Sequence, residues 1–166
     1  MRLESLIHGG GQERGRRAGT ENVLAIASLG FMTEQAADLP ERIEQMTRLR
    51  DYFETNVKIL LEGVTVNGPD RSRICNTSSL VLNEIDGETL LMNLDMKGFA
   101  VSTGAACSSG SPEPSPVLLA MGLTREEAQS SLRVSLGFET TQEDVDRFLE
   151  ALREVVVRLR TFKHGE

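Results

Sequence analysis

The chain has 166 residues, of which 39% are hydrophobic and 26% are charged, a balance typical of one globular domain with its own core. Its formal net charge of −7 repels phosphate backbones, so nucleic acid is not an expected partner. No apolar run approaches membrane-spanning length and the N-terminus lacks the apolar stretch of a signal peptide, so a cytoplasmic protein without a membrane partner is expected.

The N-terminal part of the chain begins with a loop and continues into two helices. The segment "HGGGQERGRRAGTEN" follows neither helical nor strand periodicity and is expected to be an extended loop. Thr20 or Glu21-Asn22 is placed to cap a helix over residues 23–39. A second helix is predicted over residues 40–62, because proline suits the first turn and apolar residues follow at three- and four-residue steps. The predicted buried stripe consists of Ile43, Met46, Leu49, Phe53, Val57 and Leu60.

Strands and short helices alternate in the middle of the chain. Two strands are predicted at "VTVNG" and "SSLVLNEI", and the turn at Asp86-Gly87 leads into a helix, "ETLLMNLDMKG", that ends at Gly98. "FAVST" is predicted as a further strand, which runs into a segment rich in serine, glycine and proline. A short helix, "PVLLAMG", opens after Ser115.

The last two elements are a strand and a long helix. "SSLRVSLG" alternates like a half-buried strand, with Leu132, Val134 and Leu136 on one face and Arg133 and Ser135 on the other. The helix "QEDVDRFLEALREVVVRLR" is expected to be capped by the threonine at position 140 or 141. After the first two helices the order is β-β-α-β-α-β-α, which predicts an α+β protein with a small sheet packed by helices.

Cys107 is the strongest candidate for chemistry. It lies in "AVSTGAACSSGSPEPSP", where serine and glycine leave the backbone free and three prolines oppose helix and sheet pairing. A small apolar filler is the alternative, but only two alanines nearby offer packing partners, and Cys75, which precedes a strand, suits that role better. A thiol on such a loop suits a nucleophile that collects a group at one place and delivers it at another. Two cytoplasmic cysteines are expected as thiols rather than as a disulfide.

Arg133 and His8 are weaker candidates. Arg133 stands between apolar neighbours on a short strand and could grip a substrate carboxylate, or it could belong to the solvated face of an edge strand. His8 could act as a base, yet it precedes a glycine run and is equally suited to the surface. A structural zinc site is poorly supported, since neither cysteine belongs to a CxxC pair.

Three blocks together resemble a known family. In order and spacing, "HGGGQERGRRAGTENV", "VSTGAACSSGSPEPSPVLLAMGL" and "SSLRVSLG" are similar to the group I (NifS/IscS-type) cysteine desulfurases of the aminotransferase class V family. The resemblance covers residues 3–160 and places them in the C-terminal part of such an enzyme. It implies the C-terminal small domain of the fold-type I pyridoxal phosphate (PLP)-dependent transferase fold, preceded by two long helices. Residues 23–166 would form this domain with its linking helices, and residues 1–22 would be a loop remnant of the large cofactor-binding domain.

The resemblance also implies an activity and roles for three residues. The complete enzyme would convert L-cysteine to L-alanine on pyridoxal phosphate, and Cys107 would hold the sulfur as a persulfide for a scaffold or another sulfur-acceptor protein. Arg133 matches the arginine that binds the substrate carboxylate. Thr20 matches the threonine that bonds the cofactor phosphate of the partner subunit, which implies a homodimer. Metal ligands are not implied with certainty, although Cys107 could transiently ligate an iron–sulfur cluster.

One feature of the family is missing from the sequence. The family's Schiff-base lysine stands upstream of the segment matched by "HGGGQERG", and the only lysines here are Lys58, Lys97 and Lys163. The chain alone is therefore expected to be inactive unless an N-terminal partner completes it. The alternatives are a stand-alone persulfide carrier and a non-catalytic dimerisation module. In either case, an oligomer is expected that buries the apolar helix at residues 23–38.

Overall fold

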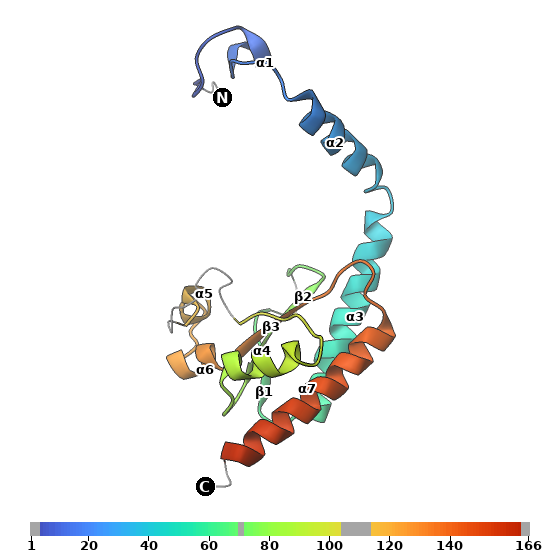
Figure 1. Cartoon of the computed structure of the whole chain (residues 1–166), viewed down its shortest axis with the longest axis vertical. Helices are drawn as coiled ribbons and strands as arrows, with labels where there is room; N and C mark the ends of the chain where they lie inside the picture. The colour runs from blue at the N-terminus through green and yellow to red at the C-terminus, as the bar shows by residue number, and fades with distance from the viewer. Residues whose placement is uncertain (1–3, 70–71, 104–113, 164–166) are drawn as a thin grey trace. The chain divides into compact units, whose positions relative to one another are not determined.

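The computed structural model describes residues 4–69, 72–103 and 114–163 (Figure 1). It divides into two compact units, Met1–Pro40 and Glu41–Glu166. The first contains the glycine-rich loop and one long helix. The second contains the sheet, the core and Arg133.

In the first unit, a loop leads into helix α2 (Val23–Glu34). The loop includes α1 (Gln12–Gly15), a single turn in which Glu13 and Arg14 adopt left-handed backbone angles. Asn22 caps α2 by accepting a hydrogen bond from the backbone N–H of Ala25, which confirms the predicted start of the helix.

The predicted end of this first helix, at residue 39, is five residues too late. Beyond Glu34 the backbone N–H groups of Ala36, Ala37 and Leu39 bond to carbonyls three residues earlier, so the α-helical ladder tightens into turns. Helix α3 (Leu39–Leu60) then begins, one residue before its predicted start.

In the second unit, three antiparallel strands form one sheet in the order β1-β2-β3. The strands are β1 (Val64–Val66), β2 (Thr77–Leu82) and β3 (Ser131–Ser135), all at predicted positions. Leu80 of β2 is opposite Leu132 of β3 in the register, so both point to the same face. Leu132 and Val134 are buried while Ser135 is exposed, which confirms the predicted alternation along β3.

Four more helices accompany the sheet. They are α4 (Gly87–Asp95), α5 (Pro116–Ala120), α6 (Arg125–Gln129) and α7 (Gln142–Lys163). Asp86 caps α4 by accepting from the backbone N–H of Thr89 at 2.8 Å. Helix α6 was not predicted, although Thr124 and Glu127 form a capping box that is visible as a T-x-x-E pattern.

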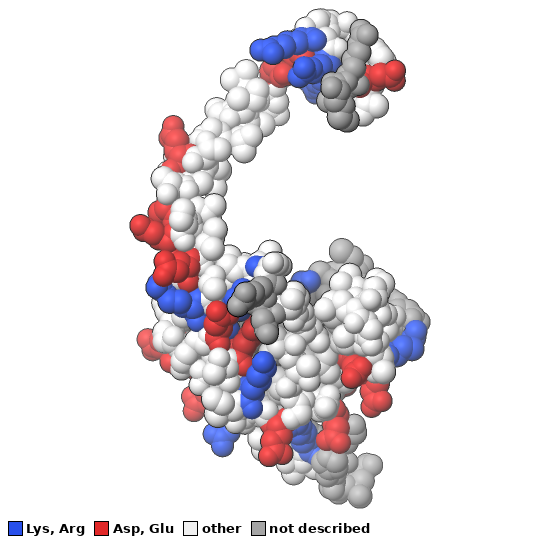
Figure 2. Space-filling view, turned by 180° about the vertical axis from the view of Figure 1, so that it is seen from behind, with Lys and Arg blue, Asp and Glu red and all other residues white. Residues whose placement is uncertain are grey.

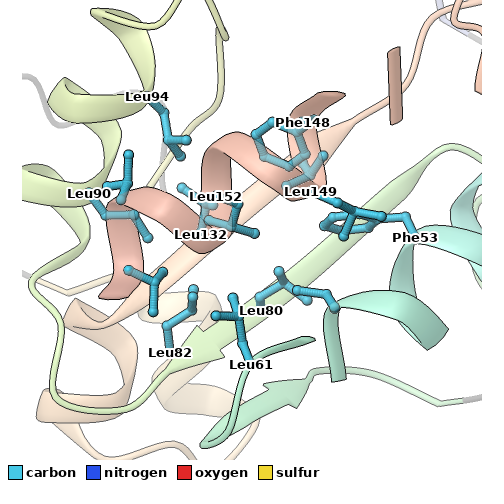
Figure 3. Close-up of a cluster of buried hydrophobic side chains, with 14 of the residues drawn as sticks. Phe53, Leu61, Leu80, Leu82, Leu90, Leu94, Leu132, Phe148, Leu149 and Leu152 are labelled. Atoms are coloured by element: carbon cyan, nitrogen blue, oxygen red, sulfur yellow. The ribbon is translucent and has the colours of Figure 1, made fainter. Parts of the chain in front are cut away.

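Side chains of α3, α4 and α7 cover one face of the sheet and form the core with it (Figure 3). Within it the ring of Phe148 on α7 lies 5.7 Å from that of Phe53 on α3 and 5.3 Å from that of Phe99. Tilted aromatic pairs at such distances are favourable. The core is therefore built mainly from residues of the second unit that are far apart in sequence.

The predicted stripe on α3 is largely confirmed. Met46, Leu49, Phe53 and Val57 are buried. The prediction is wrong at the two ends of the stripe, because Ile43 is 41% exposed and Leu60 is 39% exposed. At the C-terminal end the inward position is taken by Leu61, just beyond the helix.

A buried ion pair ties α3 to the sheet. The carboxylate of Glu54 on α3 pairs with the guanidinium of Arg73 and accepts a hydrogen bond from the hydroxyl of Ser78 on β2, at 2.6 Å. Arg73 also donates to the carbonyl of Thr77. Because Glu54 and Arg73 are both largely withdrawn from water, loss of either partner would leave the other charge poorly compensated.

Thr141, one of the two threonines predicted as candidates, caps helix α7. Its hydroxyl accepts from the backbone N–H of Asp144 at 3.2 Å and donates to the carboxylate of Asp144 at 2.7 Å. Two hydrogen bonds from Thr141 lower the pKa of Asp144: the bond from its side chain has the larger effect, and the bond from its backbone N–H the smaller.

None of the helices in the described ranges is long and apolar enough to cross a membrane.

We expect Leu152→Ala to destabilise the second unit. Leu152 on α7 is fully buried in the core, so truncation removes packed methyl groups and leaves a cavity. The expected loss is about 2–5 kcal/mol in the free energy of unfolding, measured by urea denaturation. Val157→Ala on the same helix is the matched control, because Val157 is 54% exposed and should change stability little. Equal losses in the two variants would contradict the described packing of α7.

We expect Thr141→Val to raise the pKa of Asp144 toward its usual value, because the hydroxyl that donates to the carboxylate is lost. A carboxyl with a lowered folded-state pKa contributes stability above its unfolded-state pKa, and this contribution disappears as pH falls through the folded value. An NMR pH titration of the Asp144 side chain measures the change. Thr161→Val, farther along α7, is the control and should leave that titration unmoved.

Candidate functional site

Arg133 lies at the middle of β3, on the face of the sheet opposite to the core residues Leu132 and Val134. Its side chain is half-buried. Across the register it faces Ser79 of β2, so a small polar residue is its direct cross-strand neighbour. The strand thus carries Arg133 on a face that does not belong to the main hydrophobic core.

The segment that leads into the cysteine stretch bonds to Arg133. The backbone N–H of Arg133 donates to the carbonyl of Ser102 at 2.6 Å, and the N–H of Ser102 donates to the carbonyl of Arg133 at 3.1 Å. β3 is therefore not an open edge at this residue, which argues against the edge-strand interpretation of Arg133. Residues 99–103 were predicted as a strand, but this single antiparallel bridge is the only pairing that they make within the described structure.

The residue after Ser102 lies in a closely packed region around Gly87. A Cβ atom added to Gly87, at the start of α4, would lie 2.7 Å from the carbonyl oxygen of Gln129 and 3.3 Å from the methyl group of Thr103. Real Cβ atoms do not approach backbone oxygen so closely, so glycine is required at this position. The start of α4, the entry to β3 and Thr103 therefore converge at one place.

Cys107 lies outside the described residues, so its predicted exposure on a loop stays a prediction. The segment is anchored on both flanks, by the bridge at Ser102 and by the buried Ser115, which precedes α5. Cys75 is a free cysteine and is half-buried just before β2, consistent with its expected structural role.

Thr20 lies in the first unit, exposed, between the loop and helix α2. It stands two residues before the N-cap Asn22, where the partial positive charge of a helix N-terminus favours anions. Among the described residues its hydroxyl has no hydrogen-bond partner. Thr20 and Arg133 belong to different units.

His8 and the lysines do not strengthen the candidate set. His8 is exposed in the loop of the first unit. Lys58 is exposed on α3, and Lys97 forms an ion pair with Glu154 at 2.7 Å, which engages its amine. Lys163 ends α7. Within the described ranges, no group of three histidine, cysteine, aspartate or glutamate side chains is placed to hold a metal ion.

A pocket of about 320 Å³ opens beside β3 in the second unit. Phe53, Phe99 and Phe148 contribute to its wall, and its apolar lining includes Val101 and Val134, the neighbours of Ser102 and Arg133. Because Val134 points to the core face and Arg133 to the other, this pocket and the guanidinium are on opposite sides of the strand.

Comparisons with known proteins agree with the sequence blocks. Residues 5–148 match the aminotransferase class-V family. The cysteine desulfurase IscS of Dictyoglomus turgidum is 43% identical over 161 residues, and that of Clostridium botulinum strain Hall is 45% identical over 163 residues. Both alignments cover 96% of this chain and 41% of the relative.

Solved structures give the same result. A NifS-like protein from Rickettsia africae superposes with a TM-score of 0.76 at 31% identity, covering 93% of this chain and 40% of that protein. Another NifS-like protein gives a TM-score of 0.78 at 35% identity, covering 95% of this chain. The chain therefore belongs to the class-V aminotransferase family, and it spans about two fifths of the length of the relatives it matches.

Proposed function

We propose that this chain is the C-terminal small domain of a PLP-dependent cysteine desulfurase. The observation that carries the proposal is the 43–45% identity to cysteine desulfurases along 96% of the chain. The matched region includes all three candidate residues, Thr20, Cys107 and Arg133. The substrate is L-cysteine, and the products are L-alanine and a sulfur atom held on the protein.

The proposed reaction balances without an external oxidant. The thiolate of Cys107 attacks the sulfur of L-cysteine, a new S–S bond forms, and the Cβ–S bond of the substrate breaks. The Cβ atom takes up a proton and leaves as the methyl group of L-alanine. The transferred sulfur is oxidised and the carbon is reduced, so Cys107 holds a persulfide for an iron–sulfur scaffold or another sulfur acceptor.

The proposed role of Arg133 is to bind the substrate carboxylate. A guanidinium offers two parallel donors to a carboxylate, which fixes orientation as well as charge. The bridge to Ser102 supports this role, since Cys107 follows Ser102 by only five residues. Five residues span at most about 18 Å, so chain length alone keeps the thiol within reach of the strand that carries Arg133.

The cofactor fits this chain only in part. An exposed threonine hydroxyl close to a helix N-terminus is a suitable donor to a phosphate group, which is the proposed role of Thr20 toward the site of the partner subunit. When bound, pyridoxal phosphate supplies the electron sink for C–S cleavage. Lys58 lies on α3, and the amine of Lys97 is engaged in its ion pair with Glu154. The proposal assigns the amine that binds the cofactor to a lysine that this chain does not contain.

We expect Cys107, not Cys75, to carry the sulfur. In the PLP-loaded enzyme that contains this chain, Cys107→Ser should abolish alanine formation from L-cysteine, and mass measurement of thiol-labelled peptides should find a persulfide on Cys107 in the unsubstituted protein. Cys75→Ser is the matched control and should leave both readouts unchanged. The purified chain by itself should give no Schiff-base absorbance with pyridoxal phosphate. Alanine formation by the Cys107→Ser variant, or a persulfide on Cys75, would contradict the proposal.

Association of two copies is a second candidate function, favoured by the surface of α2. Six large apolar side chains on this helix are between 56% and 79% exposed, and α2 buries none of its residues. The stretch along α2 is largely white in Figure 2, because Glu34 at its end is the one charged residue of this helix. An exposed apolar surface of this kind is typical of an interaction site. The residues are Val23, Leu24, Ile26, Leu29, Phe31 and Met32.

We expect the purified chain to form a dimer or larger oligomer, and a charge on α2 to weaken it. Leu29→Glu should shift the mass measured by light scattering toward that of one chain, because burial of a carboxylate opposes association. Met96→Glu is the control, since Met96 is 76% exposed and lies outside α2. A uniform monomer of the unsubstituted chain at all concentrations would rule out this second function.

A further inference from the structure

The loop before α2 is closed by hydrogen bonds that converge on the two residues preceding Thr20. The backbone N–H of Ala18 donates to the carbonyl of Ile7 at 3.1 Å, and Ala18 is 6% exposed. The N–H of Gly19 donates to the side-chain oxygen of Gln12 at 3.2 Å. This second hydrogen bond joins residues seven positions apart through a side chain rather than through backbone pairing.

Gln12 holds its position because of the glycine run before it. A Cβ atom added to Gly10 would lie 2.5 Å from the Oε1 atom of Gln12, the same oxygen that accepts from Gly19. A side chain at position 10 would therefore require the end of Gln12 to move. Gln12 is itself half-buried, whereas its neighbour Glu13 is exposed.

Arg17 supports the same turn from its carbonyl side. Its Nη1 atom lies 3.4 Å from the carbonyl oxygen of Gly19 and 3.5 Å from that of Thr20. Bonds of this length on an exposed side chain are weak, so Arg17 is an auxiliary contact and Gln12 is the main one. On the other side of Thr20, the Asn22 cap fixes the start of α2.

We infer that Gln12 is a positioning residue, which holds the Gly19–Thr20 turn so that the hydroxyl of Thr20 is aimed at a phosphate group before that group binds. The inference rests on the proposed phosphate-binding role of Thr20. A hydroxyl held between two anchored points loses little freedom on binding, so its hydrogen bond to the ligand retains more of its strength.

The test uses cofactor affinity of the reconstituted enzyme that contains this chain. Gln12→Met keeps the length of the side chain but removes the acceptor, and Gln12→Glu keeps an oxygen that can accept from Gly19. We expect Gln12→Met to weaken the affinity for pyridoxal phosphate about fivefold, and Gln12→Glu to restore it to within about twofold. Glu13→Gln, on the exposed neighbour, is the matched control. Amide hydrogen exchange at Gly19 in the chain should become faster in Gln12→Met only.

A double-variant cycle separates positioning from general loop stability. If Gln12 acts through Thr20, then Gln12→Met should have no further effect on cofactor affinity in a Thr20→Val background. Additive losses, or no loss in Gln12→Met while Thr20→Val weakens binding, would overturn the inference and leave the proposed role of Thr20 intact. If Thr20→Val itself left the affinity unchanged, the phosphate-binding role and the inference would both fall.

Discussion

The pairing of β3 is the constraint on which the second unit depends. One side of the strand is joined to β2, which brings Leu132 opposite Leu80 and sets the core face. The other side is joined at Ser102, and this contact attaches the entry to the cysteine stretch to the strand that carries Arg133. A one-residue slip of β3 would send Arg133 into the core and expose its neighbours Leu132 and Val134. The hydrophobic pattern of β3 therefore fixes the direction of the guanidinium as firmly as it fixes the fold.

The two units illustrate different ways of holding a side chain in place. Arg133 belongs to a strand whose neighbours Leu132 and Val134 are buried among helices α3, α4 and α7, so its backbone cannot shift without disturbing the core. Thr20 has no comparable core behind it. In the first unit the equivalent support comes from single hydrogen bonds, above all the one between Gln12 and Gly19, together with the cap at Asn22. Rigid placement of polar groups lowers the cost of binding in both cases.

The parts of the fold that the sequence predicted are those with a local signal. The middle of the stripe on α3, the alternation along β3 and the caps at Asn22 and Thr141 depend on residues only a few positions apart, and the structure contains these features. Residues 99–103 were overestimated, because their β-branched and aromatic character reflects packing of Phe99 and Val101 against the core rather than an extended ladder. The hydrogen bond between Gln12 and Gly19 could not be predicted from periodicity, since it joins a side chain to a backbone N–H across a loop.

The short length of β1 has a consequence for the behaviour of the sheet toward other chains. β1 is the outermost described strand on its side and extends over only three residues, Val64–Val66. Its outward N–H and C=O groups thus offer a very short template, and the opposite side of the sheet is partly covered at Ser102. Neither edge of the sheet therefore offers a long row of free backbone groups to which a strand of another chain could pair. The borders of the sheet are therefore less suited to joining two copies than the exposed apolar helix α2.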